Sequence, residues 1–212
     1  MMTLNDLAVR SGGGRRRKEG DMGMTVDVKH TALLVMDVQN GIVSRYIQDA
    51  SAMRPFQQAV SAARKAGMQV IFVRVAFSEG FPEASPRNKM FAHLAQAGNM
   101  TVSADTTQIH ESVRPEPGEP VVTKYRVSAF AGSNLEVILR AKDITHLVLC
   151  GIATSGVVLS TLREAADKDY ALTVLKDACL DADPEVHRVL VEKVFPRQAD
   201  VMTVEEWAKT LA

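Results

Sequence analysis

A carboxylate and an ammonium group stand at positions where they could exchange protons with a bound molecule. Asp37 follows the apolar run at 31–36, and Lys124 ends the run PVVTK. If both runs are parallel strands of one sheet, the two side chains meet at its carboxyl edge, where each stabilises the charged form of the other and burial tunes both pKa values. An aspartate that caps a loop and a lysine on a solvated face are the structural alternatives. The pair therefore predicts general acid–base chemistry at this edge.

The third feature is the segment GIATSGV at 151–157, where an apolar run passes through small residues into an amphipathic helical pattern. Such a strand-to-helix corner offers backbone N–H groups to an anion or a developing oxyanion. No residue at the helix start is an evident nucleophile: Cys150 fits a buried thiol, Thr154 fits a helix cap, and Ser155 is the other hydroxyl. Other side chains expected at strand ends are Arg74, Phe77 and Asp177.

These positions depend on a regular alternation of strands and helices. Apolar or β-branched runs predict six strands, at 31–39, 68–77, 120–124, 146–152, 170–179 and 199–203. Helical periodicity predicts helices at 47–65 (closed by Gly67), 133–143 (capped by Ser133), 154–169, 184–195 and 203–212. Runs that are apolar on both faces belong to parallel strands covered on each side. The sequence therefore predicts an α/β fold of three layers, α/β/α, with a Rossmann-like, doubly wound, mainly parallel sheet of six strands.

The stretch at 78–118 interrupts this alternation. It is rich in proline and irregular, with one short helical piece at 89–97. An insertion of this length in a regular α/β chain is typically a lid or an oligomer contact.

The composition narrows the classes of partner. Of 212 residues, 46% are hydrophobic and 24% charged, and 25 Lys and Arg balance 25 Asp and Glu. Without a field of one sign, nucleic acid and membrane partners are disfavoured. Cys150 and Cys179 are expected to be reduced core thiols, and no apolar stretch has the length of a membrane span or the form of a signal peptide. A cytoplasmic location is the expectation.

Residues 1–27 differ from the rest of the chain. The stretch SGGGRRRKEGD joins a run of three glycines to a basic cluster without apolar periodicity, which predicts a flexible arm before a single domain at 28–212. A nuclear or nucleic-acid patch is one alternative. Because Met22 and Met24 follow directly, an upstream start-site assignment or an expression remnant is the other.

Three blocks of the sequence resemble signature blocks of the isochorismatase-like hydrolases, which include nicotinamidases, N-carbamoylsarcosine amidases and isochorismatases. The blocks are ALLVMDVQNGIV, VVTKYRVSAFAGSNLEVILR and GIATSGVVLSTLREAADKDYALTVLKDAC. The resemblance runs in uninterrupted order from about Thr31 to Ala208. It implies that Asp37 and Lys124 are the catalytic aspartate and lysine. It also implies that Val157 stands where most members carry a catalytic cysteine, seventh in the pattern that begins G-x-A-T.

A valine cannot form a covalent intermediate, so the resemblance implies a mechanism without a thiol at this position. Some isochorismatases, which cleave a vinyl ether, lack the cysteine, and there the aspartate is thought to protonate the substrate. That role requires a raised pKa of Asp37, which burial supplies and Lys124 opposes. A water held by Asp37 and Lys124 that attacks a carbonyl is the other route. The backbone groups expected to form an oxyanion hole beside Val157 are those of Ile152, Ala153 and Thr154.

The resemblance also bears on substrate and cofactor. KYRVSAF is similar to the K-W-R-x-S-A-F run of isochorismatases, but the corner lacks their Y-A-H. Nicotinamidases resemble one another in an Asp-x-His metal pair after the second strand, whereas VRVAFSEGFP has no histidine and the five histidines of the chain show no ligand spacing. We expect no metal and no cofactor. The candidate substrate-binding residues are Gln39, Arg74, Phe77, Tyr125 and Gly156, with Arg87 and Arg126 as further guanidinium candidates.

Together these features predict a hydrolase that acts on a vinyl ether or on an amide or ureide C–N bond of a small polar molecule, with Asp37 and Lys124 as its acid–base pair. The alternative is a catalytically silent member that binds a small molecule or serves as an oligomeric scaffold, and Val157 motivates both. The family commonly forms dimers or tetramers, so a homo-oligomer is expected, with its contact in the 78–118 stretch.

Overall fold

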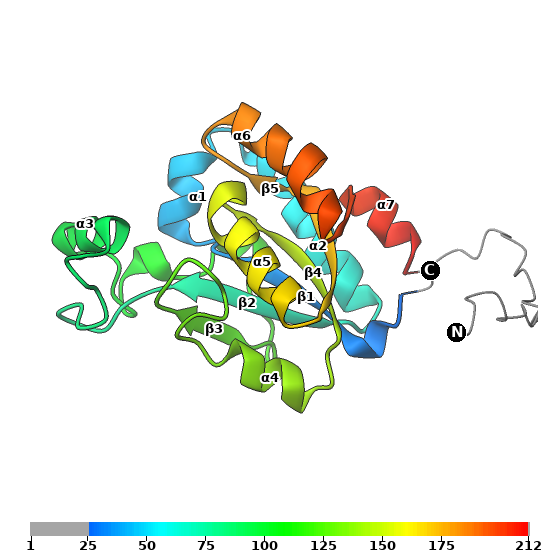
Figure 1. The fold of residues 1–212 in the computed structure, drawn as a ribbon, viewed down its shortest axis with the longest axis horizontal. Helices are drawn as coiled ribbons and strands as arrows, with labels where there is room; N and C mark the ends of the chain where they lie inside the picture. The colour runs from blue at the N-terminus through cyan, green and yellow to red at the C-terminus, as the bar shows by residue number, and fades with distance from the viewer. Residues whose placement is uncertain (1–25, 212) are drawn as a thin grey trace, which may run out of the picture.

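The computed structural model describes residues 26–211 and has a six-stranded parallel sheet at its centre (Figure 1). The strands are β1 (Thr31–Met36), β2 (Gln69–Val75), β3 (Val121–Lys124), β4 (His146–Ile152), β5 (Ala171–Leu180) and β6 (Asp200–Met202). Their spatial order is β3-β2-β1-β4-β5-β6, and every neighbouring pair is parallel. The chain therefore winds outward from β1 in both directions, and the crevice between the carboxyl ends of β1 and β4 is where such sheets bind ligands.

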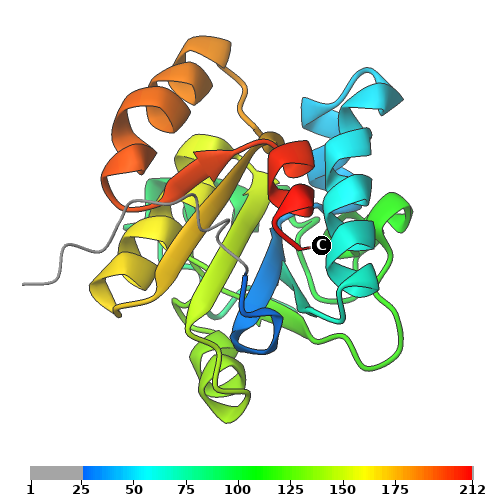
Figure 2. The same ribbon diagram turned by 90° about the vertical axis from the view of Figure 1, so that its right-hand side faces the viewer.

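Helices cover both faces of the sheet (Figure 2). On one face lie α1 (Asn40–Tyr46), α2 (Arg54–Lys65) and α7 (Val204–Lys209). On the other lie α4 (Leu135–Ala141), α5 (Leu159–Asp167) and α6 (Pro184–Val189) with the turns that continue it. The remaining helix, α3 (Lys89–Ala97), stands apart from both layers at one end of the molecule (Figure 1). The three-layer α/β/α fold expected from the sequence is confirmed.

Burial on both faces explains why the strand sequences are continuously apolar. All six residues of β1 are fully buried. Successive side chains of a strand point to opposite faces, so Leu34 packs in a cluster with Leu135 of α4 and Leu162 of α5, whereas Leu33 packs in a cluster with Phe56 of α2. The central strand is thus enclosed by both helical layers, and its carboxyl end is held in a fixed position.

The segment between β2 and β3 is the irregular insertion that the sequence predicts, and α3 lies where the helical piece was expected, at Lys89–Ala97. The insertion is attached to the ends of the central strands by two isolated bridges. Gln39 pairs with Ile109, and Phe77 pairs with Thr101. The insertion is therefore fixed against the carboxyl edge of the sheet.

Two helices begin later than the sequence predicts. The helix expected at 47–65 is α2, which starts only at Arg54, because the backbone is extended at Ile47 and Asp49 caps a separate 3-10 turn, Ala50–Met53. The helix expected from Ser133 is α4, which starts at Leu135. Ser133 still stabilises this end, since its Oγ accepts a hydrogen bond of 3.1 Å from the N–H of Leu135.

Two further expectations at the carboxyl edge are corrected. The helix after β4 begins as a π-helical turn, Thr154–Val158, in which Gly156 has non-helical angles, and regular helix follows only in α5. Asp177 does not lie at a strand end, because β5 continues to Leu180. The carboxylate of Asp177 instead accepts a hydrogen bond of 2.8 Å from the N–H of Val204, at the start of α7.

The flexible arm expected at 1–27 lies outside the described residues except for its last two. Within 26–211, none of the helices has the length and apolar character needed to cross a membrane. The same part of the chain contains no cluster of three or more His, Cys, Asp and Glu side chains suited to a metal ion.

Candidate active site

The carboxyl edge of the sheet brings Asp37 and Lys124 together. Asp37 directly follows β1, and Lys124 is the last residue of β3, two strands away. Asp37 Oδ2 lies 3.0 Å from Lys124 Nζ, and the side chains are 8% and 2% exposed. The chain turns at Asp37, whose backbone is left-handed (φ 57) and whose N–H donates to the carbonyl of Val73 at 2.8 Å. The predicted acid–base pair is therefore a buried ion pair.

The two oxygens of the Asp37 carboxylate have different surroundings. Oδ2 accepts from Lys124, whose ammonium also donates to the backbone oxygen of Arg126 at 2.9 Å. Oδ1 is buried and has no hydrogen-bond partner. Burial raises the pKa of Asp37, and the charge and hydrogen bond of Lys124 oppose that rise without cancelling it. An unsatisfied buried acceptor is unfavourable, which makes Oδ1 a candidate acceptor for a donor that enters the cavity.

The strand-to-helix corner after β4 lies beside this pair. Gly151 passes so close to β1 that a Cβ there would be 2.5 Å from the carbonyl oxygen of Met36, so only glycine permits this approach. Beyond it, Ala153, Gly156 and the buried Val157 line the same cavity as Asp37 and Lys124. The corner predicted from the sequence is thus a wall of the candidate active site.

Several backbone N–H groups of the corner are already engaged. Ser155 N donates to Asp181 Oδ2 at 2.6 Å. The N–H groups of Gly156 and Val158 both donate to the carbonyl of Ala153, at 3.1 and 3.3 Å. These three amides are therefore not free to receive charge from a ligand.

Thr154 does not cap the helix, contrary to the expectation. It is fully buried, and its Oγ1 shares a hydrogen bond of 2.8 Å with Nδ1 of His187 on α6. Burial lowers the pKa of His187, and the charge of Asp181 partly opposes this. The corner is thus tied to the segment that contains Asp181 and His187 by one backbone and one side-chain hydrogen bond.

Asp37 and Lys124 form the floor of a cavity of about 600 Å³. The corner after β4, α1 and the insertion form its walls. Its surface is mainly apolar, and three charged side chains line it, namely Asp37, Lys124 and Arg45. The other residues around it are Gly41, Ile42, Tyr46, Val75, Met90, Phe91, Leu94, Ala97, Asn99, Met100, Thr106, Val127 and Ile152. An apolar pocket with a few convergent polar groups and a perturbed carboxyl pKa is suited to proton transfer on a small molecule.

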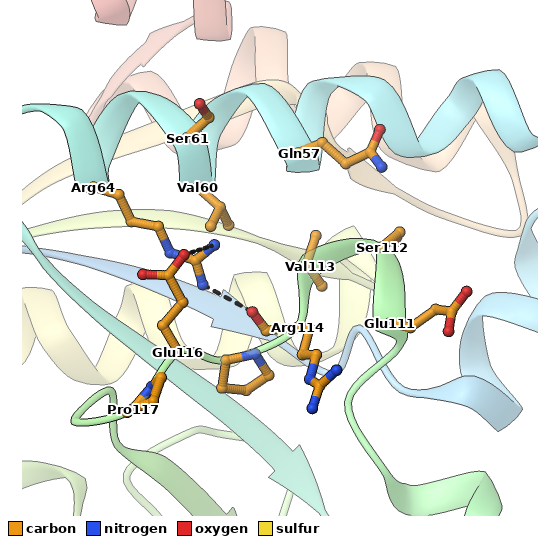
Figure 3. A pocket seen from close by; sticks show the side chains of 11 residues that line it. Gln57, Val60, Ser61, Arg64, Glu111, Ser112, Val113, Arg114, Glu116 and Pro117 are labelled. Carbon is orange, nitrogen blue, oxygen red and sulfur yellow. Dashed lines mark hydrogen bonds and ion pairs between the residues drawn. The ribbon is translucent and has the colours of Figure 1, made fainter.

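A larger hollow of about 840 Å³ lies along α2 and the loop at 111–117 (Figure 3). Its Arg64 is occupied by Glu119, at 2.7 Å, and by the backbone oxygen of Arg114, at 2.8 Å. Neither Asp37 nor Lys124 lines this hollow. Size alone therefore does not make it the reactive site, and the smaller cavity holds the acid–base pair.

Comparison with known proteins decides the family. The chain matches the Isochorismatase domain family over residues 31–206. It belongs to the isochorismatase family. It is 33% identical over 184 residues to the uncharacterized isochorismatase family protein YwoC of Bacillus subtilis (strain 168). The aligned region covers 87% of this chain and 95% of that protein. It is 35% identical over 205 residues to ureidoacrylate amidohydrolase RutB of Stutzerimonas stutzeri (strain A1501). That alignment covers 86% of this chain and 79% of RutB.

The fold of this isochorismatase-family chain also matches solved structures. A cysteine hydrolase from Pseudomonas syringae pv. phaseolicola 1448A superposes with a TM-score of 0.81 at 21% identity, over 88% of this chain and 94% of that one. The resemblance inferred from the three motif blocks is confirmed, and it makes the chain a member of a family of hydrolases.

Gln39 takes a different place from the one expected. Its side chain is fully buried and does not line the cavity. Its Nε2 donates to the carbonyls of Val75 and Thr107, both at 3.0 Å, and its Oε1 accepts from the N–H of Val75 at 2.9 Å. In this isochorismatase-family chain, the side chain of Gln39 connects β2 to the insertion.

Three other expected substrate contacts, Arg74, Phe77 and Tyr125, lie outside the lining of the cavity. Arg74 is used by Thr123 Oγ1, at 3.1 Å, and by Gln108 Oε1, at 3.0 Å. Phe77 is fully buried, and its ring lies 6.2 Å from that of Tyr125. None of the three lines the cavity, and of the five expected contacts only Gly156 does.

The two further arginine candidates also lie outside the cavity. The guanidinium of Arg126 stacks 5.5 Å from the centre of the Phe91 ring and donates to the backbone oxygen of Tyr125 at 2.5 Å. Arg87 is exposed on the insertion. Arg126 therefore supports the cavity only indirectly, through Phe91, which is part of its wall.

The sequence interpretation missed the wall formed by α1 and α3. Ile42, Arg45 and Tyr46 line the cavity from α1, with the three- and four-residue spacing of one helix face. That spacing was visible directly after Asp37, but the helix was expected to start only at 47. Phe91 and Leu94 repeat the pattern on α3.

Proposed function

We propose that this isochorismatase-family chain hydrolyses a small polar molecule, at an amide or ureide C–N bond or a vinyl ether, by an acid–base mechanism that uses Asp37 and Lys124 and no cysteine nucleophile. The observation that carries the proposal is the buried Asp37–Lys124 pair with Asp37 Oδ1 unpartnered in the cavity floor. Val157, in the position where the resemblance implies the family's cysteine, contributes an apolar surface.

For a C–N bond, the proposed steps conserve every proton. A water hydrogen-bonded to Asp37 Oδ1 attacks the carbonyl carbon while Asp37 takes one of its protons. The protonated Asp37 then gives that proton to the leaving nitrogen as the C–N bond breaks, so the products are an acid and an amine. Burial supports both steps because it raises the pKa of Asp37 and brings the carboxylic acid form within reach.

Lys124 and the corner have supporting roles in this mechanism. An ammonium has three donors, and Asp37 Oδ2 and the Arg126 oxygen take two of those of Lys124, which leaves the third for the substrate or the attacking water. The corner amides that remain as candidates for an oxyanion hole are those of Ile152, Ala153 and Thr154, as expected from the sequence, and that of Val157.

A thiol-free mechanism agrees with the state of both cysteines. Cys150 and Cys179 are buried in the sheet, and neither lines the cavity. Burial raises the pKa of Cys179 to about 12 and raises that of Cys150 well above its usual range. Since the thiolate is the nucleophilic form, neither side chain is suited to attack a substrate.

The relative named as a ureidoacrylate amidohydrolase supports the C–N bond as the first choice of reaction. A vinyl ether remains the second choice, because Asp37 with a raised pKa also suits protonation of an enol ether carbon. Both choices use the same floor of the cavity.

The test is a substrate screen of the purified protein against ureides, carbamates, primary amides and vinyl ethers, beside Asp37→Asn and Lys124→Ala. We expect turnover of one class by the wild type and a loss of at least about a hundredfold in kcat in Asp37→Asn. Activity should survive treatment with a thiol-alkylating reagent. If both variants keep the full activity of the wild type, the proposed site is wrong; a protein that binds members of the panel but converts none is the silent binder instead.

A further inference from the structure

The loop at 125–130, which follows β3, is bound to helix α5 by two hydrogen bonds that the proposed mechanism does not use. The N–H of Ala129 donates to Oγ1 of Thr161 at 2.9 Å. The Oγ of Ser128 donates to Oε2 of Glu164 at 2.5 Å. Ala129 and Thr161 are fully buried, and Ser128 is 8% exposed. Water cannot readily replace hydrogen bonds at such buried positions, so they fix the loop on the helix.

The same loop also packs on α5 through apolar side chains. Ala129 and Phe130 belong to the buried cluster that contains Val157 of the corner and Leu162 of α5. The corner and the helix form one continuous stretch of chain at 154–167. The loop and the corner that lines the cavity are therefore both held by this stretch.

The loop supplies an acceptor to the ammonium group of the proposed acid–base pair. The backbone oxygen of Arg126 accepts from Lys124 Nζ at 2.9 Å, and Asp37 Oδ2 lies 3.0 Å from the same nitrogen. Val127, the next residue of the loop, lines the cavity. The ammonium group is therefore held by a carboxylate and by a carbonyl whose position depends on how the loop is fixed.

We propose that Thr161 and Glu164 are positioning residues that act through the loop at 125–130. They fix the backbone oxygen that accepts from Lys124, and this oxygen keeps the ammonium group in contact with Asp37. Neither Thr161 nor Glu164 lines the cavity, so neither is a substrate contact. The proposal rests on the function proposed above, because it assigns these residues to the placement of the same acid–base pair.

Thr161→Val is the main variant. Valine has nearly the shape of threonine and lacks the hydroxyl, so it leaves the buried N–H of Ala129 without its acceptor. Thr161→Ser keeps the hydroxyl and tests for rescue. The matched control is Thr173→Val, at another buried threonine, whose Oγ1 shares a hydrogen bond of 2.9 Å with Nε2 of His146 near the amino ends of β4 and β5.

The first measurement needs no turnover. The carboxyl carbon of Asp37 is followed by NMR against pH in protein with isotopically labelled aspartate, and its signal is assigned by its loss in Asp37→Asn. Lys124 opposes the burial that raises the pKa of Asp37, so a less firmly held ammonium lets this pKa rise further. We expect the titration midpoint to rise by at least about 0.5 in Thr161→Val. Thr161→Ser and Thr173→Val should keep the wild-type midpoint.

The second measurement uses a substrate found in the screen described above. Thr161→Val should lower kcat at least about fivefold and leave KM within about twofold, because it displaces a reacting group without removing a substrate contact. Thr161→Ser should recover most of kcat, and Thr173→Val should keep all of it. Ser128→Ala removes the hydrogen bond to Glu164 and should act in the same direction as Thr161→Val. If Thr161→Val does not fold, Ser128→Ala decides by the same criteria.

The outcomes separate this proposal from the proposed function. An unchanged or lowered midpoint in Thr161→Val, or an equal rise in Thr173→Val, overturns the positioning role whether or not the wild type is an active hydrolase. A raised midpoint with unchanged kcat in an active enzyme overturns it as well. A rise that depends on Thr161 in a protein that hydrolyses none of the screened substrates supports the placement of Lys124 by α5 and overturns only the reaction.

Discussion

Replacement of Lys124 by methionine is the sharpest test of the buried pair. Methionine has a similar length and an apolar side chain, so Lys124→Met removes the ammonium with little loss of volume. Asp37 then remains buried with neither oxygen bound, because Oδ2 loses Lys124 and Oδ1 has no partner already. The variant isolates the cost of one uncompensated carboxylate in the floor of the cavity.

The size of the effect follows from burial. The two side chains are 8% and 2% exposed, so water does not screen them as it screens a surface pair. Removal of one partner from a buried ion pair costs about 3–5 kcal/mol. We therefore expect the free energy of unfolding of Lys124→Met to fall by about 3–5 kcal/mol at about pH 8, where Asp37 must either stay charged or take up a proton.

The loss of stability in Lys124→Met should depend on pH in a defined direction. Burial raises the pKa of Asp37 in the folded protein, and Lys124→Met removes both effects that lower it, so the folded pKa rises further above the unfolded value of about 3.9. A raised folded pKa contributes stability below the unfolded pKa, and that contribution is lost as pH rises through the folded pKa. The deficit of the variant against the wild type should therefore be smallest near about pH 4 and reach its full size above the folded pKa.

Urea unfolding across this pH range measures the deficit, and the double variant Asp37→Asn/Lys124→Met is the control. It removes both charges, so we expect it to recover all but about 1–2 kcal/mol, the remainder being the hydrogen bond to the Arg126 oxygen. The reasoning is refuted if the single variant loses less than about 1 kcal/mol at high pH, or if the double variant is no more stable than the single one.

The remaining predictions concern the corner and the thiols. In the native protein, Cys150 and Cys179 should react with a thiol reagent only as fast as the protein opens, with full reaction in urea, because burial raises both pKa values; rapid native labelling would contradict this. Gly151→Ala should lower the free energy of unfolding by about 2–4 kcal/mol, because the added Cβ would lie 2.5 Å from a carbonyl oxygen of β1. A change within experimental error would show that the two strands separate easily. Thr154→Val should lower kcat more than it raises KM, because the hydroxyl bonded to His187 orients the corner. Thr154→Ser keeps the hydroxyl and should restore kcat. Equal effects of both variants would assign Thr154 a packing role only.

The layers of this fold could be predicted from the sequence because burial on both sides leaves a plain pattern. β1 is apolar at every position after Thr31, and β4 was expected at the bounds observed, His146–Ile152. The start of α2 could not be predicted in the same way. Ile47 is apolar and fits a helical stripe, but the chain is extended there and turns at Asp49 before the helix begins. A local pattern cannot distinguish one long helix from two short ones that pack separately.

The candidate site was predictable where it depends on strand ends and unpredictable where it depends on the insertion. Asp37 directly follows one strand of the sheet and Lys124 ends another, so parallel topology alone brings them together. Gln39 lies two residues after Asp37 and has an equally polar side chain, but its partners are backbone groups of Val75 and Thr107. Nothing in the sequence indicates which polar residue at a strand end is used by the backbone of a distant segment.

Val157 lies at the cavity wall where the resemblance implies a nucleophile. It is buried at the start of the helical corner and lines the same cavity as Asp37, so its methyl groups take up space that a nucleophile would need at this wall. Family membership places the chain in a family of hydrolases, but an attacking atom at this wall cannot come from the valine. In the proposed mechanism the attacking water is held instead by Asp37, whose Oδ1 is buried and has no hydrogen-bond partner. The proposed mechanism therefore depends on the buried carboxylate and not on a side-chain nucleophile, and the Asp37 and Lys124 variants test that dependence directly.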